Sequence, residues 1–443
     1  MNFRFFARIT VFLLVFFLPF GTRLIFRSGE IDGAAVEWGT VSLYGTQVLV
    51  PLFFVLAAIS SGRQSIRRVI VHPASILIIV LAGLSSVSAA LTVTGQVGPS
   101  FIAVSWVILG WMIIVSILAL RPPSRIIYWG ILLSAAIQAV LAIGQFLTQS
   151  VFSFKWLGMA AHRASDLGAY VAETGDGRWL RAYGSFGHPN ILGFFLVLGI
   201  VSAAALLSDG SGRRTRIAVW PILAVIGAAL IFTLSKSALI AGAVALAVCL
   251  VFAFGKKNRE SVRVIGTVSL LVFLGMAAVF PFAKDPVLSR IAVANRLETN
   301  SVSERMDLIS DAVTVFRHRP FFGVGPGQMP LAVHQGTADS RSPWGYQPVH
   351  NVPLLVLTET GAVGLAAWLV LFGFLLISAI RNFKSPHQSF FLAFLSAVLV
   401  VSIFDHFLWS LWPGQLMVWL VMALILVPAD RPFRIPLRSP KVR

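Results

Sequence analysis

The stretch HNVPLLVLTETGAVG, at residues 350–364, opens an apolar run that continues to about Ile380. The longest polar segment of the chain lies directly before it, so a His-Asn pair stands where an exposed loop would lead into a membrane helix. Pro353 fits there, because the first helical turn has no intrahelical partner for the N–H that proline lacks. Asn351 is a suitable N-cap. His350 is therefore predicted at the start of a membrane helix.

Helical geometry predicts how this stretch presents its side chains. At about 100° per residue, Gly361 and Gly364 fall within roughly 40° of His350, whereas Glu359 points to the opposite face. A stripe of glycines allows a second helix to approach closely. We therefore expect His350 to lie above a tightly packed helix–helix seam. The plainer alternative is an ordinary helix start whose histidine only decorates the interface.

Composition places the whole chain in a membrane. Of its 443 residues, 57% are hydrophobic and 12% are charged, about half the charged share of a soluble protein. These values predict an all-α polytopic membrane protein. Cys249 is the single cysteine, so a disulfide framework is excluded.

Apolar runs of roughly the length needed to cross a bilayer recur along the chain. They predict about twelve membrane helices, at residues 5–20, 42–60, 69–90, 101–120, 126–148, 190–208, 217–234, 237–255, 264–283, 352–380, 388–408 and 412–428. No small-residue cleavage site follows the first run, so we interpret it as a retained span. The polar break Ser235-Lys236-Ser237 predicts a tight turn between two spans.

The basic residues fix the expected orientation. With the N-terminus and C-terminus in the cytoplasm, 21 of the 35 basic residues and 3 of the 17 acidic residues fall on the cytoplasmic side. The whole surplus of +18 then lies inside, as the positive-inside rule requires. The basic balance therefore indicates topology and contact with anionic lipid, and no nucleic-acid partner is expected.

This topology divides the chain into membrane and external parts. Helices are expected in residues 1–148, 190–283 and 351–428, external loops at 149–189 and 284–350, and a basic cytoplasmic tail at 429–443. The longer loop contains SVSERMDLISDAVTVF (301–316), whose apolar positions form one stripe. It predicts an amphipathic helix on the outer surface, with Ser301 and Glu304 at capping-box spacing.

Four polar clusters are expected on the outer side, and three of them supply the cations Arg181, Lys236 and Arg305. Cations at a membrane surface suit a phosphate-bearing substrate. The fourth cluster supplies His350, and the positive end of the helix behind it favours the neutral imidazole that a general base needs. The alternatives are plainer: Arg181 caps a loop, and Arg305 contacts lipid head groups. Lys236 is harder to dismiss, because an external cation between two spans opposes the positive-inside trend.

Two acids fall inside predicted spans. Glu359 and Asp405 are functional candidates because intramembrane acids are rare, although the position of Glu359 favours helix packing. Asp405-His406 with Trp409 and Trp412 is typical of an interfacial aromatic belt. The chain has no P-loop, zinc-protease or nucleophile-elbow motif and no dense external acidic cluster, so neither a metal nor another cofactor is expected.

Together, four segments within residues 181–380 resemble the O-antigen ligase family, which also includes surface-polysaccharide polymerases and bacterial protein O-oligosaccharyltransferases. The segments are RAYGSFGHPNILGF (181–194), TLSKSALIA (233–241), RMDLISDAVTVFRHRPFFGVGPG (305–327), and His350-Asn351 followed by Gly361 and Gly364. The resemblance implies an all-α bundle of the second subclass of the C-type glycosyltransferases. It implies transfer, without metal, of a glycan from an undecaprenyl-diphosphate carrier outside the bacterial inner membrane.

The resemblance also implies residue roles. His350 would be the catalytic base, and Arg181, Lys236 and Arg305 would bind the donor diphosphate or orient the acceptor. Lys236 departs from the family, which often has Arg there, and a lysine lacks the bidentate fork. The supporting residues would be Asn190, Asn351, Gly323, Gly325, Gly361 and Gly364.

The acceptor stays open at this point. Ligases use lipid A-core, polymerases use another lipid-linked glycan, and oligosaccharyltransferases use a protein hydroxyl. We favour a ligase or polymerase, because the sequence contains no appended protein-recognition domain. The alternative from another class is a non-enzymatic exporter or flippase of lipid-linked glycans, but a transporter would be expected to have broken helices with paired polar groups at mid-membrane.

Reporter fusions test the predicted topology. Fusions near residues 66, 213, 258 and 384 should be active as cytoplasmic reporters, and fusions near 165 and 330 as external ones, because of the charge asymmetry. A cytoplasmic signal from the fusion near 330 would contradict the orientation.

Overall fold

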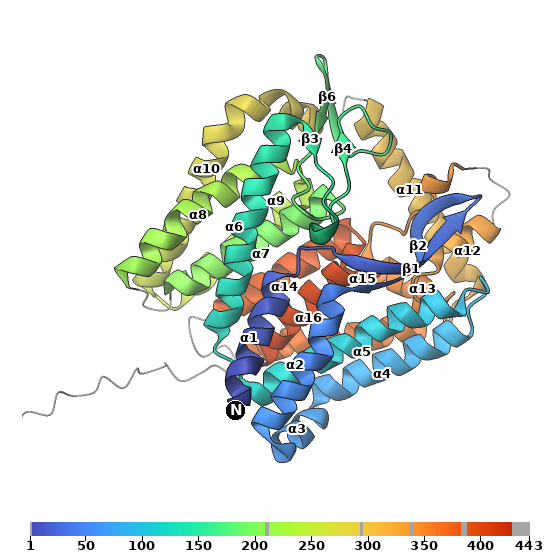
Figure 1. The fold of residues 1–443 in the computed structure, drawn as a ribbon, viewed down its shortest axis with the longest axis horizontal. Helices are drawn as coiled ribbons and strands as arrows, with labels where there is room; N and C mark the ends of the chain where they lie inside the picture. The colour runs from blue at the N-terminus through green and yellow to red at the C-terminus, as the bar shows by residue number, and fades with distance from the viewer. Residues whose placement is uncertain (1, 209–211, 293–295, 337–340, 382–387, 428–443) are drawn as a thin grey trace, which may run out of the picture.

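The computed structural model describes residues 2–208, 212–292, 296–336, 341–381 and 388–427. The protein is mostly helical, at 74%, and its strands form three two-stranded antiparallel sheets (Figure 1). The expected all-α class is therefore correct for the bulk of the chain but omits these sheets. The predicted cytoplasmic tail, 429–443, lies outside the described residues.

Eight helices in the described residues are long and apolar enough to cross a membrane. They are α4 (Pro73–Ala90), α5 (Val97–Leu120), α6 (Ser124–Thr148), α7 (Pro189–Ser208), α8 (Arg213–Phe232), α9 (Lys236–Gly255), α10 (Arg259–Ala292) and α13 (Val352–Arg381). A ninth candidate is the pair α2 (Gly45–Ser61) and α3 (Arg63–Ile70), which is bent by 119°. Gly62, at φ +77°, makes the bend.

Three further helices coincide with the remaining predicted spans. They are α1 (Phe3–Phe16), α14 (Gln388–Phe404) and α16 (Trp412–Leu426), of 14, 17 and 15 residues. By length and apolarity the described residues thus hold eight or nine spans where twelve were expected. The difference arises because apolar sequence continues past the ends of these short helices, into turns and the connection after α14.

Helix α7 lies at the centre of the bundle, and 94% of the residues in its apolar 18-residue stretch are buried. It packs against α6, α8, α9, α10 and α14. Figure 1 shows α8 and α10 side by side at one edge of the molecule and α4 and α5 side by side at another. The polar residues at the start of α7 therefore face neighbours from several parts of the chain.

A β-hairpin stands between α1 and α2, where the sequence had predicted no element. Strands β1 (Arg23–Ile31) and β2 (Ala34–Tyr44) are joined by Asp32-Gly33, both at positive φ, as a two-residue hairpin turn requires. Arg23 forms a bidentate pair with Glu37 across the hairpin, at 2.5 and 2.7 Å. Short strands also occur in the loop after α6: β3 (Ser150–Val151), β4 (His162–Arg163), β5 (Val171–Thr174) and β6 (Gly177–Leu180).

The long loop before α13 contains the predicted amphipathic helix, which is α11 (Arg296–His318). It starts before Ser301, so the expected capping box at Ser301 and Glu304 is wrong: both residues lie inside the helix. A short helix, α12 (Met329–Gly336), follows it. Arg341 returns to α11 through a bidentate pair with Asp311, at 2.5 and 3.0 Å.

Helix α13 is broken at Gly361, where φ is +71° and ψ is −175°. The break frees backbone groups on both sides, and in a membrane bundle such groups must be satisfied within the protein. The segment 320–325 satisfies them: Ala362 and Val363 donate to Pro320 and Phe321, and Val324 and Gly325 donate to Thr358 and Glu359. The four bonds are 2.8 to 3.3 Å long, so this segment is clamped to the broken turn of α13.

The break makes the predicted glycine face wrong. Counting 100° per residue assumed an unbroken helix and a helical partner. Instead, a Cβ at Gly361 would overlap the backbone of Phe321, and one at Gly364 would overlap the side chain of Thr360 in the same helix. The close approach that these glycines allow is therefore between α13 and a non-helical segment, or within α13 itself.

Replacing Gly361 by alanine should destabilise the protein. Alanine strongly disfavours this backbone conformation, and its methyl group would collide with Phe321, so we expect a loss of about 2–4 kcal/mol in unfolding free energy. The measurement is the melting temperature of the detergent-purified protein. Gly373→Ala is the matched control, because Gly373 lies in α13 at ordinary φ with nothing within 4 Å of an added Cβ. Equal melting temperatures would contradict the role of the break.

Candidate functional site

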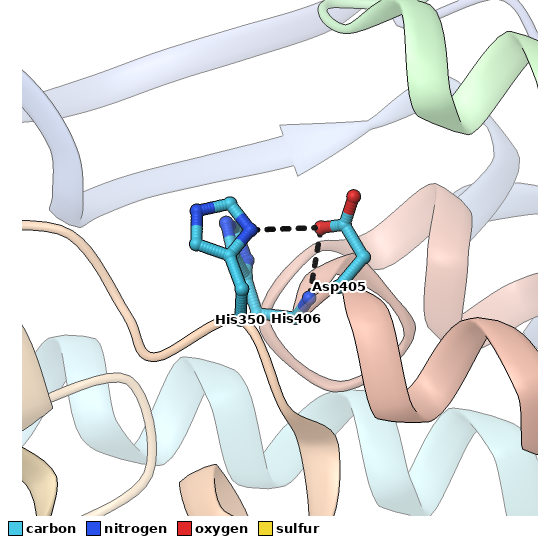
Figure 2. Close-up of side chains that lie close together, drawn as sticks. All are labelled: His350, Asp405 and His406. Atoms are coloured by element: carbon cyan, nitrogen blue, oxygen red, sulfur yellow. Dashed lines mark hydrogen bonds and ion pairs between the residues drawn. The ribbon is translucent and has the colours of Figure 1, made fainter. Parts of the chain in front are cut away.

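His350, Asp405 and His406 lie together where the loop before α13 meets the connection after α14 (Figure 2). Nδ1 of His350 is 3.7 Å from Oδ1 of Asp405, and the two imidazole rings are 4.9 Å apart between centroids. The same Asp405 oxygen accepts the backbone N–H of His406 at 2.8 Å. The cluster therefore places two imidazoles against each other, with one carboxylate beside the ring of His350.

Local hydrogen bonds hold His350 in place. Asn351 caps α13, as its position predicted, by accepting the N–H of Leu354 at 2.9 Å. Its amide also donates to the carbonyl of Ile403, near the end of α14, at 3.3 Å. Asn351 thus joins the start of α13 to the end of α14, and this brings His350 to Asp405.

A series of buried side chains extends from Asp405. Its second oxygen accepts the side-chain N–H of Asn190 at 2.8 Å, and the oxygen of Asn190 accepts the guanidinium of Arg181 at 2.7 Å. Arg181 also donates from Nε to the carbonyl of Thr233 at 2.9 Å, and it is only 5% exposed. The series connects three of the four segments that carry the family resemblance: 181–194, 233–241 and the stretch that begins at His350.

The surroundings fix the charges of this cluster. Burial raises the pKa of Asp405, but His350, His406 and His188 lower it by more, so the net pKa lies well below its usual range. Burial lowers the pKa of His406 to about 3; His350 lowers it further, and Asp405 opposes the shift. Burial likewise holds the pKa of His188 well below its usual value. At neutral pH, Asp405 is therefore ionised, and His406 and His188 are neutral.

His350 remains accessible from one side. Its side chain is 18% exposed, and Figure 2 shows its second ring nitrogen pointing away from Asp405. The 3.7 Å separation exceeds hydrogen-bond length, but such contacts are often loose in proteins without substrate and tighten when it binds. An imidazole with a carboxylate behind it and a free nitrogen in front is the arrangement of a general base.

The other predicted cations lie at different distances from the cluster. Lys236 is exposed at the first position of α9, directly after the turn 233–235 that follows α8, and Ser235 caps α9 by accepting the N–H of Ala238. The turn predicted there is confirmed, and it reaches the cluster through Thr233 and Arg181. Arg305 is half-buried on α11, and among the described residues no hydrogen bond or ion pair links its side chain to the cluster.

Two of the predicted supporting glycines form the clamped segment. Gly323 and Gly325 have φ of +68° and +108°, and a Cβ at Gly323 would overlap the backbone of Glu359. Side chains from the N-terminal helices hold this part of the site: Ser88 donates to Glu359 O at 2.6 Å, and Thr92 and Ser100 donate to Val324 O and Pro326 O at 2.7 and 3.0 Å. Helices without any sequence motif thus support the site.

The aromatic belt expected around Asp405-His406 is wrong. Trp409 and Trp412 are buried, at 7% and 0% exposure, and their indoles donate to Glu359 Oε2 and Thr46 Oγ1, both at 2.8 Å. Asp405 and His406 belong to the cluster instead. One signal in the sequence pointed to this cluster: an acid and a histidine stand side by side in an apolar run. The sequence did not show that His350 is their partner.

His350, Asp405 and His406 could also supply metal ligands. One ligand atom from each lies within 4.8 Å of the other two, and nitrogen and carboxylate ligands suit zinc and related ions. Both oxygens of Asp405 already accept hydrogen bonds, and Nδ1 of His406 bonds with Ser410 at 2.7 Å. The expectation that no metal takes part is tested with a chelator below.

Residues 221–369 match the family model described as O-antigen ligase. The match covers the turn at Lys236, helix α11, the clamped segment and the start of α13 with His350. It does not cover Arg181, Asn190 or Asp405, which reach the matched region through the contacts above. No curated protein matches the chain.

Arg181→Ala should destabilise the protein by about 2–4 kcal/mol, because Asn190 Oδ1 and the Thr233 carbonyl lose their buried donor and the series loses its positive charge. Arg178→Ala is the matched control: Arg178 is exposed on β6, and its loss should change stability by less than about 0.5 kcal/mol. Melting temperatures in detergent compare the two. Similar values would mean that the buried series contributes no stability.

Proposed function

Because the chain carries an O-antigen ligase domain at residues 221–369 and so belongs to the O-antigen ligase and polymerase family, we propose that it transfers a glycan from undecaprenyl diphosphate to an acceptor hydroxyl. The observation that carries this proposal is His350, which has an ionised carboxylate behind it and a ring nitrogen directed away from that carboxylate. A protein that only moves lipid-linked glycans across the bilayer has no need of such a base.

The reaction is a direct displacement. His350 takes the proton of the acceptor hydroxyl, and that oxygen forms a bond with the anomeric carbon of the donor sugar. The bond between this carbon and the diphosphate oxygen breaks, and undecaprenyl diphosphate leaves with the electron pair. A single displacement inverts the anomeric configuration.

Asp405 supports His350 in this step. Its carboxylate stabilises the imidazolium that forms and fixes the ring orientation, without itself becoming protonated, in line with its lowered pKa. The neutral state of His406 matters as well, because a second cation 4.9 Å away would oppose protonation of His350. We therefore assign Asp405 and His406 as positioning and electrostatic residues.

Positive charge stabilises the leaving diphosphate. Lys236 is exposed and stands at the N-terminus of α9, where the helix dipole also favours an anion. Arg181 is buried with two internal bonds, so it contributes by its field and by fixing Asn190 rather than by a flexible grip. Arg305, on α11, is the remaining candidate diphosphate contact.

The proposed location is the bacterial inner membrane, with the site on the outer face; the concentration of basic residues on the opposite side supports it. The acceptor is lipid A-core or a growing glycan, with a protein hydroxyl as the alternative. The broken helix α13 would fit an exporter, but the backbone groups it frees are occupied by residues 320–325 rather than directed into a pathway.

His350→Gln should abolish transfer while leaving a folded protein. Glutamine can hydrogen-bond a hydroxyl but cannot take its proton, and removal of a general base costs roughly 10²–10⁴-fold in rate. The measurement is the initial rate with purified protein and a synthetic undecaprenyl-diphosphate-linked glycan, alongside the melting temperature. His318→Gln is the control, because His318 is exposed near the end of α11.

Two outcomes would overturn this assignment. Full activity of the His350→Gln protein would reduce His350 to a structural residue at a helix start. Loss of parent activity on adding EDTA, restored by a divalent metal, would turn His350, Asp405 and His406 into a metal site and remove the base mechanism.

A further inference from the structure

A hollow beside the histidine cluster is not used by the mechanism above. It comprises about 640 Å³ of space between atoms, including the part open to solvent. Its walls come from β2, α4, α5, the segment after Gly325, and the α15–α16 region, where α15 is Phe407–Ser410. Most of these walls lie outside the residues that match the family model.

Several polar atoms of its walls are buried and have no protein partner. Ser85 and Gln415 are 1% and 3% exposed, and neither Ser85 Oγ nor Gln415 Oε1 makes a hydrogen bond within the described residues. Nε1 of Trp106, in the same walls, is also buried without a partner. Buried polar groups are normally satisfied, so three such atoms around one hollow indicate a ligand that offers both donors and acceptors.

The walls are also aromatic. Trp38, Trp106 and Trp409 line the hollow, together with small and apolar residues of α5. The face of an indole carries negative charge density, which attracts the weakly positive C–H groups on the face of a sugar ring. Flat apolar surfaces next to isolated hydrogen-bonding groups match a pyranose, which has apolar faces and a polar rim.

The lining argues against the other parts of the proposed substrates. The charged residue in the lining is Glu37, whose two oxygens are paired with Arg23, so a diphosphate would meet a neutralised ion pair there rather than an available cation. A polyprenyl tail would leave Ser85, Gln415 and Trp106 without partners. A neutral saccharide is the part of the substrates that satisfies both kinds of wall.

The hollow adjoins the cluster at His406. The ring of Trp38 contacts His406 edge-on, with centroids 5.6 Å apart, and Ser410 both lines the hollow and bonds with His406. Arg181 instead reaches the cluster through Asn190 and Asp405. The hollow therefore contacts the cluster at His406, whereas Arg181, a proposed diphosphate residue, connects to it at Asp405.

From these observations we propose that the hollow binds the acceptor saccharide and presents its hydroxyl to His350. This inference rests on the proposed transfer reaction, because only that reaction gives the bound saccharide the role of acceptor. Saccharide binding itself rests on the residues that line the hollow. Trp38, Ser85 and Gln415 are then residues that determine which acceptor is used.

The experiment titrates detergent-purified protein with oligosaccharides released by mild acid from the source cell's own surface polysaccharide, which carry neither lipid nor diphosphate. Trp38→Ala should weaken binding about tenfold and Ser85→Ala about fivefold, through loss of a stacking face and of one hydrogen bond. Ser85→Ala should not lower the melting temperature, because the hydroxyl that it removes has no protein partner. Trp156→Ala, on an exposed loop residue, is the matched control and should bind as the parent does.

The outcomes separate this proposal from the proposed reaction. In the transfer assay, Ser85→Ala should raise the KM for the acceptor about fivefold with kcat and the donor KM unchanged, and His350→Gln should still bind the oligosaccharide. If transfer depends on His350 but both hollow variants bind like Trp156→Ala, the hollow is not the acceptor site. If undecaprenyl phosphate displaces the oligosaccharide, the hollow takes lipid and the inference is wrong. If no transfer occurs yet binding still depends on Trp38 and Ser85, the reaction fails and the saccharide site stands.

Discussion

Satisfaction of the backbone at the break in α13 is the constraint on which the site depends. A helix interrupted nine residues after its start exposes polar groups that neither lipid nor a neighbouring helix can pair. The segment 320–325 pairs with them only because Gly361 has no side chain at the crossing. This clamp fixes the chain between α11 and α13, and with it the loop that delivers His350. Ser88, Thr92 and Ser100 then attach the same clamp to α4, α5 and the connection between them.

Buried charge is the second constraint. Arg181 and Asp405 come from segments more than two hundred residues apart, and Asn190 joins them by donating to one and accepting from the other. Removing either charge alone would leave the other uncompensated, which is far more costly than the pair itself. The arrangement keeps Asp405 ionised, as its low pKa reflects, and a permanently ionised carboxylate is what a neighbouring imidazole needs in order to accept a proton.

The sequence predicted those parts of the fold that follow from local rules. Membrane helices, the turn at Ser235, the cap at Asn351 and the amphipathic helix α11 depend on apolar length, capping chemistry and periodicity, which are properties of short segments. The break at Gly361 could not be predicted, because an apolar run with two glycines is equally compatible with a continuous helix. The short helices α1, α14 and α16 were overestimated for a related reason: apolar residues also fill buried turns.

The sequence identified several residues of the site, but it did not show which of them contact one another. His350, Arg181 and Asn190 were selected from their segments, and the structure places them in one series. Asp405 was assigned to an aromatic belt, because its partners lie in other segments and only the packing of α7 against α14 brings them together. Arg305 shows the converse: a place in a motif does not by itself bring a side chain to the cluster.

The two sides of the histidine cluster differ in where their residues come from. Many of the residues that the proposed reaction assigns to the base and the leaving diphosphate lie in the matched region or are bonded to it, whereas the hollow is built mainly from β2 and α5. In the proposed displacement, chemistry at the anomeric carbon is the same for every acceptor, because proton removal and diphosphate departure do not depend on which hydroxyl attacks. Acceptor choice depends on shape and hydrogen bonding some distance from that bond. Under the proposed assignment, a chain that keeps the first set of residues would change its acceptor by altering Ser85 or Gln415 while leaving the base undisturbed.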